Sequence, residues 1–66
     1  MERLGTIFAH NLREYRRKNG LTQEKLAEKV DVSTHHIGML ELTRNFPTFD
    51  LIERLAEALN IEIYEL

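Results

Sequence analysis

The sequence predicts an all-α fold, a compact bundle of four to five short helices formed by a single domain over residues 1–66. Apolar residues recur at spacings of three and four along most of the chain, which is the period of an α-helix. Turn and cap residues interrupt this pattern at 19–20, 31–33, 43–48 and 60, so each uninterrupted piece has the length of a short helix. Strand patterns are weak everywhere except in the last six residues.

Composition excludes several classes of protein. The chain is 42% hydrophobic and 30% charged and has no cysteine, which suits a soluble surface and excludes disulfides and thiolate zinc sites. No apolar run is long enough to span a membrane, and residues 1–5 lack the layout of a signal peptide, so we expect a cytoplasmic protein. Because 66 residues leave little room for a substrate cleft, we expect no enzyme, cofactor or small-molecule ligand.

Charge is divided unevenly between the two halves of the chain. Nine Lys and Arg against eleven Asp and Glu give a net charge of −2, which argues against indiscriminate binding to polyanions. Residues 1–30 carry seven basic and four acidic groups, net +3, whereas residues 31–66 carry two basic and seven acidic groups, net −5. Such a molecule can offer one basic face to phosphates although its total charge is negative.

The first two predicted helices span residues 6–19 and 22–29. The first ends at Gly20, which favours the left-handed conformation that closes a helix. Thr22 is a favourable N-cap for the second helix, and Leu21 and Leu26 occupy the positions of a hydrophobic staple. The apolar stripe of the first helix consists of Leu4, Phe8, Leu12 and Tyr15.

The third predicted helix spans residues 33–42, with Ser33 as its N-cap. Only residues 30–32 separate it from the second helix. A connection this short forces a steep angle between two short helices, which is the geometry of a helix-turn-helix.

The fourth predicted helix begins at Thr48, with Asp50 in its first turn near the positive end of the helix dipole. The tail, residues 61–66, is ambiguous. It forms either one more helical turn that packs Tyr64 and Leu66 on the bundle, or a short strand that pairs with a second subunit, and we favour the helical turn. The apolar stripe of the fourth helix consists of Leu51, Ile52, Leu55, Ala56 and Leu59.

The third helix has an outward face without Lys or Glu. At 100° per residue, Ser33, Ile37 and Leu40 point to the opposite, inward side. A merely exposed surface is the ordinary explanation, but small polar groups and a thioether also suit base edges in the major groove. A glycine on this face permits either close packing or close approach to the groove. We assign base reading to Thr34, His35, Gly38 and Met39.

Other polar residues suit the DNA backbone. Gln23 stands at the first position of the second helix, where its side chain and backbone amide lie at a positive helix end. Arg16 has two candidate roles, a phosphate contact and an ion pair with Glu41 that ties the first helix to the end of the third. The predicted phosphate contacts are Gln23, Arg16, His36, Arg44 and Asn45.

These residues make a family resemblance recognisable. The stretch Gly-Leu-Thr-Gln-Glu-x-Leu-Ala at 20–27, followed by Val-Ser at 32–33, Ile37 and Leu-Glu at 40–41, closely resembles the Xre/Cro-like helix-turn-helix family over nearly the whole chain. The resemblance implies a lambda-repressor-like bundle with the helix at about 33–42 in the major groove. It also implies sequence-specific binding of double-stranded DNA by a transcriptional regulator, and we favour a repressor over an activator.

The resemblance assigns roles by position and also shows departures. Gln23 matches the family's phosphate-binding glutamine, and Arg16 with Glu41 matches its helix-tying ion pair. Asp31 replaces a turn glycine that is usual in the family, and Gly38 replaces a base-facing serine. A glycine that often follows the glutamate is also replaced, in the stretch 42–43.

Two rival functions differ in class from DNA binding. The first is a protein-interaction or dimerisation module on the same fold with weak or no DNA affinity, which the net acidity and Gly38 favour. The second is an enzyme or metal site built on His10, His35 and His36. Adjacent histidines on a helix point about 100° apart, so His35 and His36 cannot readily share one metal.

We expect a homodimer on a palindromic operator, because one domain of this size buries little surface on DNA. In such a dimer the two third helices lie about 34 Å apart, one turn of DNA. The alternative is that the apolar residues at the C-terminal end complete the core of a monomer. The candidate interface residues are Leu59, Ile61, Ile63, Tyr64 and Leu66.

Overall fold

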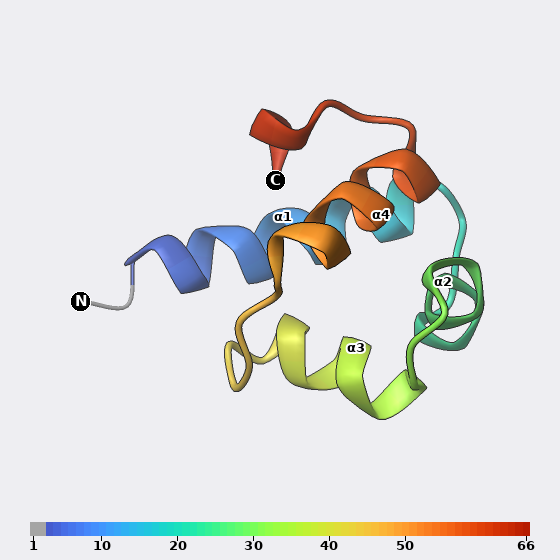
Figure 1. Cartoon of the computed structure of the whole chain (residues 1–66), viewed down its shortest axis with the longest axis horizontal. Coiled ribbons are helices and arrows are strands. Elements are labelled where there is room, and N and C mark those ends of the chain that lie inside the picture. Colours follow the sequence, from blue (N-terminus) through green and yellow to red (C-terminus); the bar gives the residue numbers. More distant parts are fainter. Residues whose placement is uncertain (1–2) are drawn as a thin grey trace.

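A computed structural model describes residues 3–66 of the chain as five helical segments (Figure 1). They are α1 (Arg3–Lys18), α2 (Gln23–Val30), α3 (Thr34–Glu41), α4 (Phe49–Leu59) and the 3₁₀ turn η1 (Ile63–Glu65). No strand occurs within residues 3–66, so the predicted all-α class is confirmed. The tail forms the favoured helical turn instead of a strand.

The helix α1 begins three residues before the predicted start at Thr6. Its first turn contains Gly5, whose missing side chain lets the ring of Phe46 approach the backbone. A Cβ atom on Gly5 would lie 3.3 Å from Cε1 of that ring. Thr6, the predicted start, therefore lies within the helix, and Phe46 from the loop before α4 packs on the first described turn.

Hydroxyl side chains cap the other three α-helices at their N-termini. Thr22 Oγ1 accepts the N–H of Lys25 at 3.0 Å, and Ser33 Oγ accepts the N–H of His36 at 3.0 Å. Thr48 Oγ1 caps α4 in the same way, at 3.1 Å. These bonds satisfy backbone donors that have no partner within the helix, so the three predicted starts are confirmed.

Left-handed residues close three of the helices. Gly20, Asp31 and Asn60 follow α1, α2 and α4 with φ of 69°, 60° and 59°. After Asp31, the N–H of Val32 donates to the carbonyl oxygen of Ala27 at 3.0 Å, which is the long bond of a Schellman motif. Asp31 therefore adopts the conformation that glycine usually supplies at this turn.

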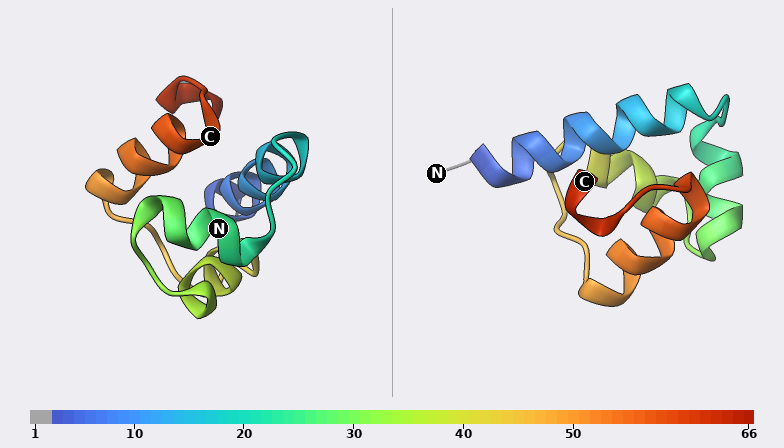
Figure 2. Two further views of the ribbon diagram at one scale, coloured as in Figure 1. Left: turned by 90° about the vertical axis from the view of Figure 1, so that its right-hand side faces the viewer. Right: turned by 90° about the horizontal axis from the view of Figure 1, so that it is seen from above.

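The core lies where the four α-helices meet. In the left view of Figure 2, α2 and α3 lie below α1 and α4. Leucine and isoleucine side chains from every α-helix are fully enclosed there, which holds the short α2 and α3 at a steep angle. The core cluster consists of Leu12, Leu26, Ala27, Val30, Ile37, Leu40, Leu51, Leu55 and Leu59.

The C-terminal tail folds back onto α1. The hydroxyl of Tyr15 donates to Glu65 Oε1 at 3.1 Å, and Asn11 Nδ2 donates to the carbonyl oxygen of Leu66 at 3.2 Å. Leu66 and Ile61 pack against the core. Within residues 3–66, no helix combines the length and apolarity that crossing a bilayer requires.

Candidate nucleic-acid interface

A side chain of α4 holds the turn between α2 and α3 in place. Nη1 of Arg54, on α4, donates to the carbonyl oxygen of Val30 at 2.6 Å, and Nη2 pairs with Asp50 at 3.0 Å. The last carbonyl groups of a helix lack intrahelical partners, so Arg54 caps α2 and ties α4 to the turn. Sequence reasoning missed this role, because an arginine four residues after an aspartate has the pattern of a simple surface pair.

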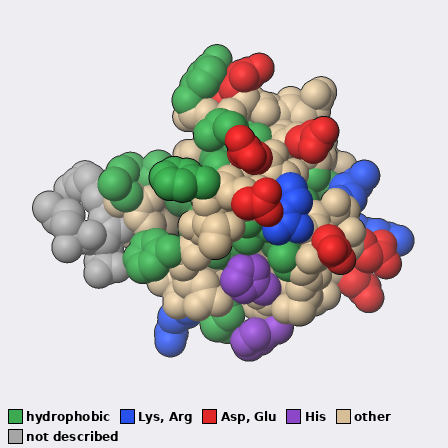
Figure 3. All heavy atoms as spheres, viewed as in Figure 1, with side chains coloured by type: hydrophobic (Ala, Val, Ile, Leu, Met, Phe, Trp, Pro, Cys, Tyr) green, Lys and Arg blue, Asp and Glu red, His purple; other side chains and the backbone are tan. Residues whose placement is uncertain are grey.

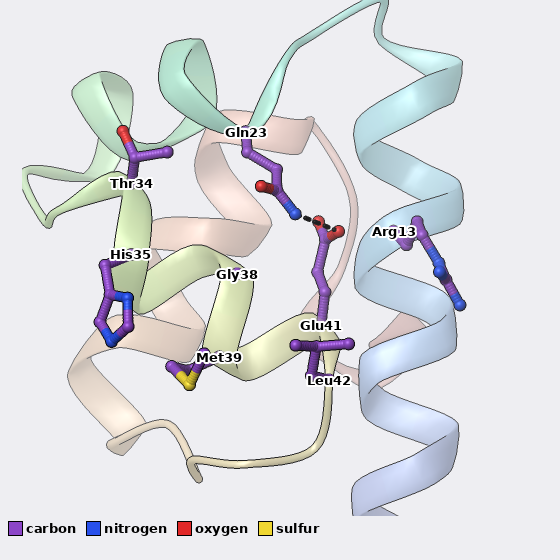
Figure 4. A pocket seen from close by; sticks show the side chains of 8 residues that line it. All are labelled: Arg13, Gln23, Thr34, His35, Gly38, Met39, Glu41 and Leu42. Atoms are coloured by element: carbon purple, nitrogen blue, oxygen red, sulfur yellow. Dashed lines mark hydrogen bonds between the residues drawn. The ribbon is translucent and has the colours of Figure 1, made fainter.

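All four residues predicted to read bases line one open hollow on α3, with a volume of about 340 Å³ (Figure 4). Thr34 and His35 are exposed, and Gly38 and Met39 are half-buried. The inward residues Ile37 and Leu40 have no exposed surface. Ser33, which the helical period placed with them, is exposed, because its side chain caps the helix. The hollow is lined by Arg13, Gln23, Thr34, His35, Gly38, Met39, Glu41 and Leu42.

Glu41 connects three elements beneath this hollow. Its Oε2 accepts Nε of Arg16 at 2.6 Å and its Oε1 accepts Nη2 at 3.1 Å. Oε1 also accepts Nε2 of Gln23 at 3.0 Å. The side chains of Arg16 and Glu41 are only 12% and 4% exposed, so the structure places the two residues in the ion pair that the sequence suggested and adds Gln23 to it.

Arg16 has little left to offer to a phosphate. Its third nitrogen, Nη1, donates to the carbonyl oxygen of Leu21 at 2.9 Å, so each guanidinium nitrogen already has a partner within the subunit. Of the two roles that the sequence allowed, the structure supports the ion pair. The guanidinium lies mostly under the surface and faces Glu41, and its contact with phosphate stays a prediction.

The remaining phosphate candidates are not gathered at one place. Arg44 is exposed in the loop after α3, and its backbone N–H donates to the carbonyl oxygen of Met39 at 2.8 Å. His36 is half-buried beside the exposed His35. Asn45 lines a different hollow, of about 310 Å³, formed mainly by apolar residues. Arg13, a further basic residue, lines the α3 hollow.

That second hollow belongs to an apolar surface that sequence reasoning missed. Phe46 and Phe49 are 78% and 88% exposed, and Leu4 is 82% exposed. Figure 3 shows hydrophobic side chains gathered toward the N-terminal end of α1, histidines over α3, and acidic side chains over α4 and the tail and at the edge formed by α2. The hollow is lined by Leu4, Gly5, Phe8, Asn45, Phe46, Pro47 and Ile52.

The candidate dimer residues divide into two groups. Leu59 is 1% exposed and lies in the core, so its assignment to an interface is wrong, because it has no free surface to present. Ile61 and Leu66 also pack against the core, whereas Ile63 and Tyr64 are 51% and 86% exposed. Part of the tail therefore completes the core of the monomer, and part remains exposed for contact with another molecule.

Comparisons with known proteins agree with this geometry. The helix-turn-helix family model matches residues 12–66. The chain is 46% identical over 54 residues to an uncharacterized HTH-type transcriptional regulator of Methanothermobacter thermautotrophicus, covering 82% of this chain and 78% of the relative. It is 38% identical over 60 residues to the control protein C.SmaI of Serratia marcescens, covering 91% and 71%.

Solved structures give the same result. The restriction-modification controller protein C.AhdI of Aeromonas hydrophila superimposes with a TM-score of 0.88 at 34% identity, over 92% of each chain. The clp gene regulator ClgR of Corynebacterium glutamicum superimposes with a TM-score of 0.90 at 27% identity, over 94% of this chain and 66% of ClgR. The chain therefore belongs to the Xre/Cro-like helix-turn-helix family of DNA-binding transcriptional regulators.

Proposed function

We propose that α3 enters the major groove of an operator and reads bases with Thr34, His35, Gly38 and Met39. The observation that carries this proposal is their convergence on one open hollow whose only acidic member, Glu41, is buried and paired. The width of the major groove admits a helix, and α3 carries no acidic residue besides Glu41. The α3 face can therefore approach DNA although the net charge is −2.

Contacts to the DNA backbone position this helix. Gln23 is the first residue of α2, so its backbone N–H has no partner within the helix and can donate to a phosphate. The half-buried His36 on α3, and the exposed Arg44 and half-buried Asn45 in the loop after it, supply further contacts. Arg16 acts indirectly, by holding Glu41 and with it the end of α3.

The active form is a homodimer on a palindromic operator. A single module of this kind buries a small area on DNA, and the domain measures only 30 × 24 × 21 Å. Ile63 and Tyr64 on η1 provide exposed apolar surface for a second copy. In the dimer the two α3 helices lie about 34 Å apart.

Repression in the cytoplasm is the regulatory outcome that we propose. A protein bound over a promoter blocks transcription by occupancy alone, whereas activation requires a further contact with the transcription machinery. The alternative function is a protein-interaction module with weak or no DNA affinity, and the exposed Phe46 and Phe49 favour it, because isolated apolar patches mark protein contacts.

Selection of bound DNA from a random pool tests the proposed function. We expect the enriched sequences to contain two inverted half-sites about 10 base pairs apart. Affinity for the winning duplex is then measured by fluorescence anisotropy between 50 and 200 mM salt, where we expect a steep decrease as phosphate contacts are lost. A protein that binds no duplex even at the lowest salt is the interaction module instead.

A further inference from the structure

The orientation of the Gln23 side-chain amide is fixed by chemistry. A carboxylate only accepts hydrogen bonds, so the amide presents its nitrogen to Glu41, with Nε2 3.0 Å from Oε1 of Glu41. Glu41 is itself held by two bonds from Arg16 and is 4% exposed at its side chain. Because Glu41 holds the nitrogen of the Gln23 amide, the amide oxygen, Oε1, is presented on the opposite side.

That oxygen faces the hollow on α3. Figure 4 shows it pointing away from Glu41, toward the side on which Thr34 and Gly38 lie. A Cβ atom built on Gly38 would lie 3.8 Å from Gln23 Oε1 and meet nothing else within 4 Å. The bond to Glu41 is the one hydrogen bond that this side chain makes with residues 3–66. Oε1 is thus an available acceptor above a backbone without a side chain.

An acceptor at this place has a restricted set of partners on DNA. Phosphate oxygens are themselves acceptors, so Oε1 cannot bind them. In the major groove the donors are the exocyclic amino groups of adenine (N6) and cytosine (N4). Guanine and thymine present carbonyl oxygens O6 and O4 instead, and these repel Oε1.

We infer that Gln23 is a specificity-determining residue, whose Oε1 accepts a hydrogen bond from an exocyclic amino group of adenine or cytosine at one position of each half-site. The inference rests on the proposed function, since it requires α3 in the major groove. The base contact uses Oε1 alone and leaves the backbone N–H of Gln23 and the second N–H of Nε2 to the phosphate. Gly38 contributes space, because the absence of a side chain leaves the approach to Oε1 open.

The test compares base preference between wild-type protein and Gln23→Ala, which keeps the backbone N–H. Wild-type protein should prefer adenine or cytosine at one position by about fivefold to tenfold over guanine or thymine. In Gln23→Ala this preference should fall to within about twofold while the other positions keep theirs. The enriched base shows whether the amino group belongs to adenine or cytosine. Lys25→Ala, an exposed neighbour on α2, is the control and should leave the preference unchanged.

Two further comparisons make the result independent of any general loss of affinity. At the assigned position, adenine is replaced by purine, or cytosine by 2-pyrimidinone, each of which lacks the amino group. The replacement should weaken binding of wild-type protein about fivefold more than that of Gln23→Ala. Gly38→Ala, whose added methyl group fits at an ordinary contact distance from Oε1, should weaken the same preference without loss of fold.

Uniform weakening of all sequences by Gln23→Ala, with equal effects of the base analogues on both proteins, overturns the inference and restores a phosphate contact. The same result with a clear selected operator leaves the proposed function intact. Wild-type protein that selects no sequence and binds no duplex at low salt overturns both.

Discussion

The guanidinium of Arg16 and the carboxylate of Glu41 are joined at two points, by bonds of 2.6 and 3.1 Å. Arg16 lies on α1 and Glu41 is the last residue of α3, so this pair fixes the end of α3 against the longest helix described. Gln23 joins the pair from the first turn of α2. One buried carboxylate therefore connects the ends of three helices beneath the α3 hollow.

Removing one partner of the Arg16–Glu41 pair should lower the free energy of unfolding far more than removing both partners. Glu41→Leu leaves the Arg16 charge buried without a partner, and such variants lose about 3–5 kcal/mol. The double variant with Arg16→Met and Glu41→Leu should recover most of this loss, because an apolar pair needs no desolvation of charge. Urea denaturation followed by circular dichroism measures both values.

The exposed pair of Lys25 and Glu28 provides the control. These side chains are 66% and 72% exposed and their charged atoms lie 3.9 Å apart, so Glu28→Ala should change the free energy of unfolding by less than about 0.5 kcal/mol. If the double variant of Arg16 and Glu41 loses as much stability as its two single variants together, the Arg16–Glu41 pair acts through packing alone.

Thr43 is held in a conformation that suits glycine. Its φ is 59°, in the left-handed region that β-branched residues seldom adopt. Thr43→Gly should relieve this strain and stabilise the fold by about 1 kcal/mol, which raises Tm by roughly 4–8 °C in a domain of this size. Thermal denaturation checks the shift, and Thr6→Gly, in the middle of a helical turn, should lower Tm instead.

The fold was largely predictable because its signals are local. Thr22, Ser33 and Thr48 each cap the helix that follows them, and the bonds within each cap span only three residues. The apolar period placed Ile37 and Leu40 in the core and left Thr34 and His35 on the surface. At these positions the capping side chains and the apolar residues predicted from the sequence are the ones that cap the helices and fill the core in the structure.

The parts that sequence reasoning missed depend on distant contacts. Phe46 packs on Gly5 in the first described turn of α1, and neither residue signals the other along the chain. The direction of the Gln23 amide depends on Glu41, which lies on another helix. Leu59 has the same apolar character as an interface residue, and only its enclosure by the other helices places it in the core.

Arg54 should prove more important for stability than its position beside Asp50 suggests. Arg54→Ala removes the bond from Nη1 to the Val30 carbonyl oxygen and leaves the end of α2 without this partner. We expect a loss of about 1–3 kcal/mol, measured by urea denaturation. Arg17→Ala, at an exposed position on α1, should change stability by less than about 0.5 kcal/mol; equal effects of the two variants would refute the capping role.

Docking of the tail should depend on pH through Tyr15. The hydrogen bond to Glu65 is the main cause that raises the pKa of Tyr15 above its ordinary value of 10.0, with desolvation and the Glu65 charge acting in the same direction. The protonated phenol is therefore favoured in the folded state. Its contribution to stability is complete below pH 10 and is lost as pH rises through the raised pKa.

Absorbance titration can isolate this group, since the chain has two tyrosines and no tryptophan. In Tyr64→Phe, the phenolate signal comes from Tyr15 alone and should appear above pH 10. Adding Glu65→Gln should move the titration back toward 10.0, because the charged acceptor is gone. An unchanged midpoint after Glu65→Gln would exclude Glu65 as the cause.

Arg44 and His35 should affect DNA binding in different ways because they occupy different places. Arg44 is exposed in the loop beyond α3, whereas the exposed His35 lines the α3 hollow, so in the proposed complex Arg44 contacts phosphate and His35 contacts bases. Arg44→Ala should weaken binding to every duplex similarly and reduce the slope of log K against log salt by about one. His35→Ala should leave that slope nearly unchanged and alter the preferred base at one position.

Anisotropy titrations on the selected operator and its single-base variants measure both effects. If changing His35 and Met39 together leaves every preference intact, neither residue reads bases, and specificity then resides in Gln23, Thr34 or the shape of the DNA.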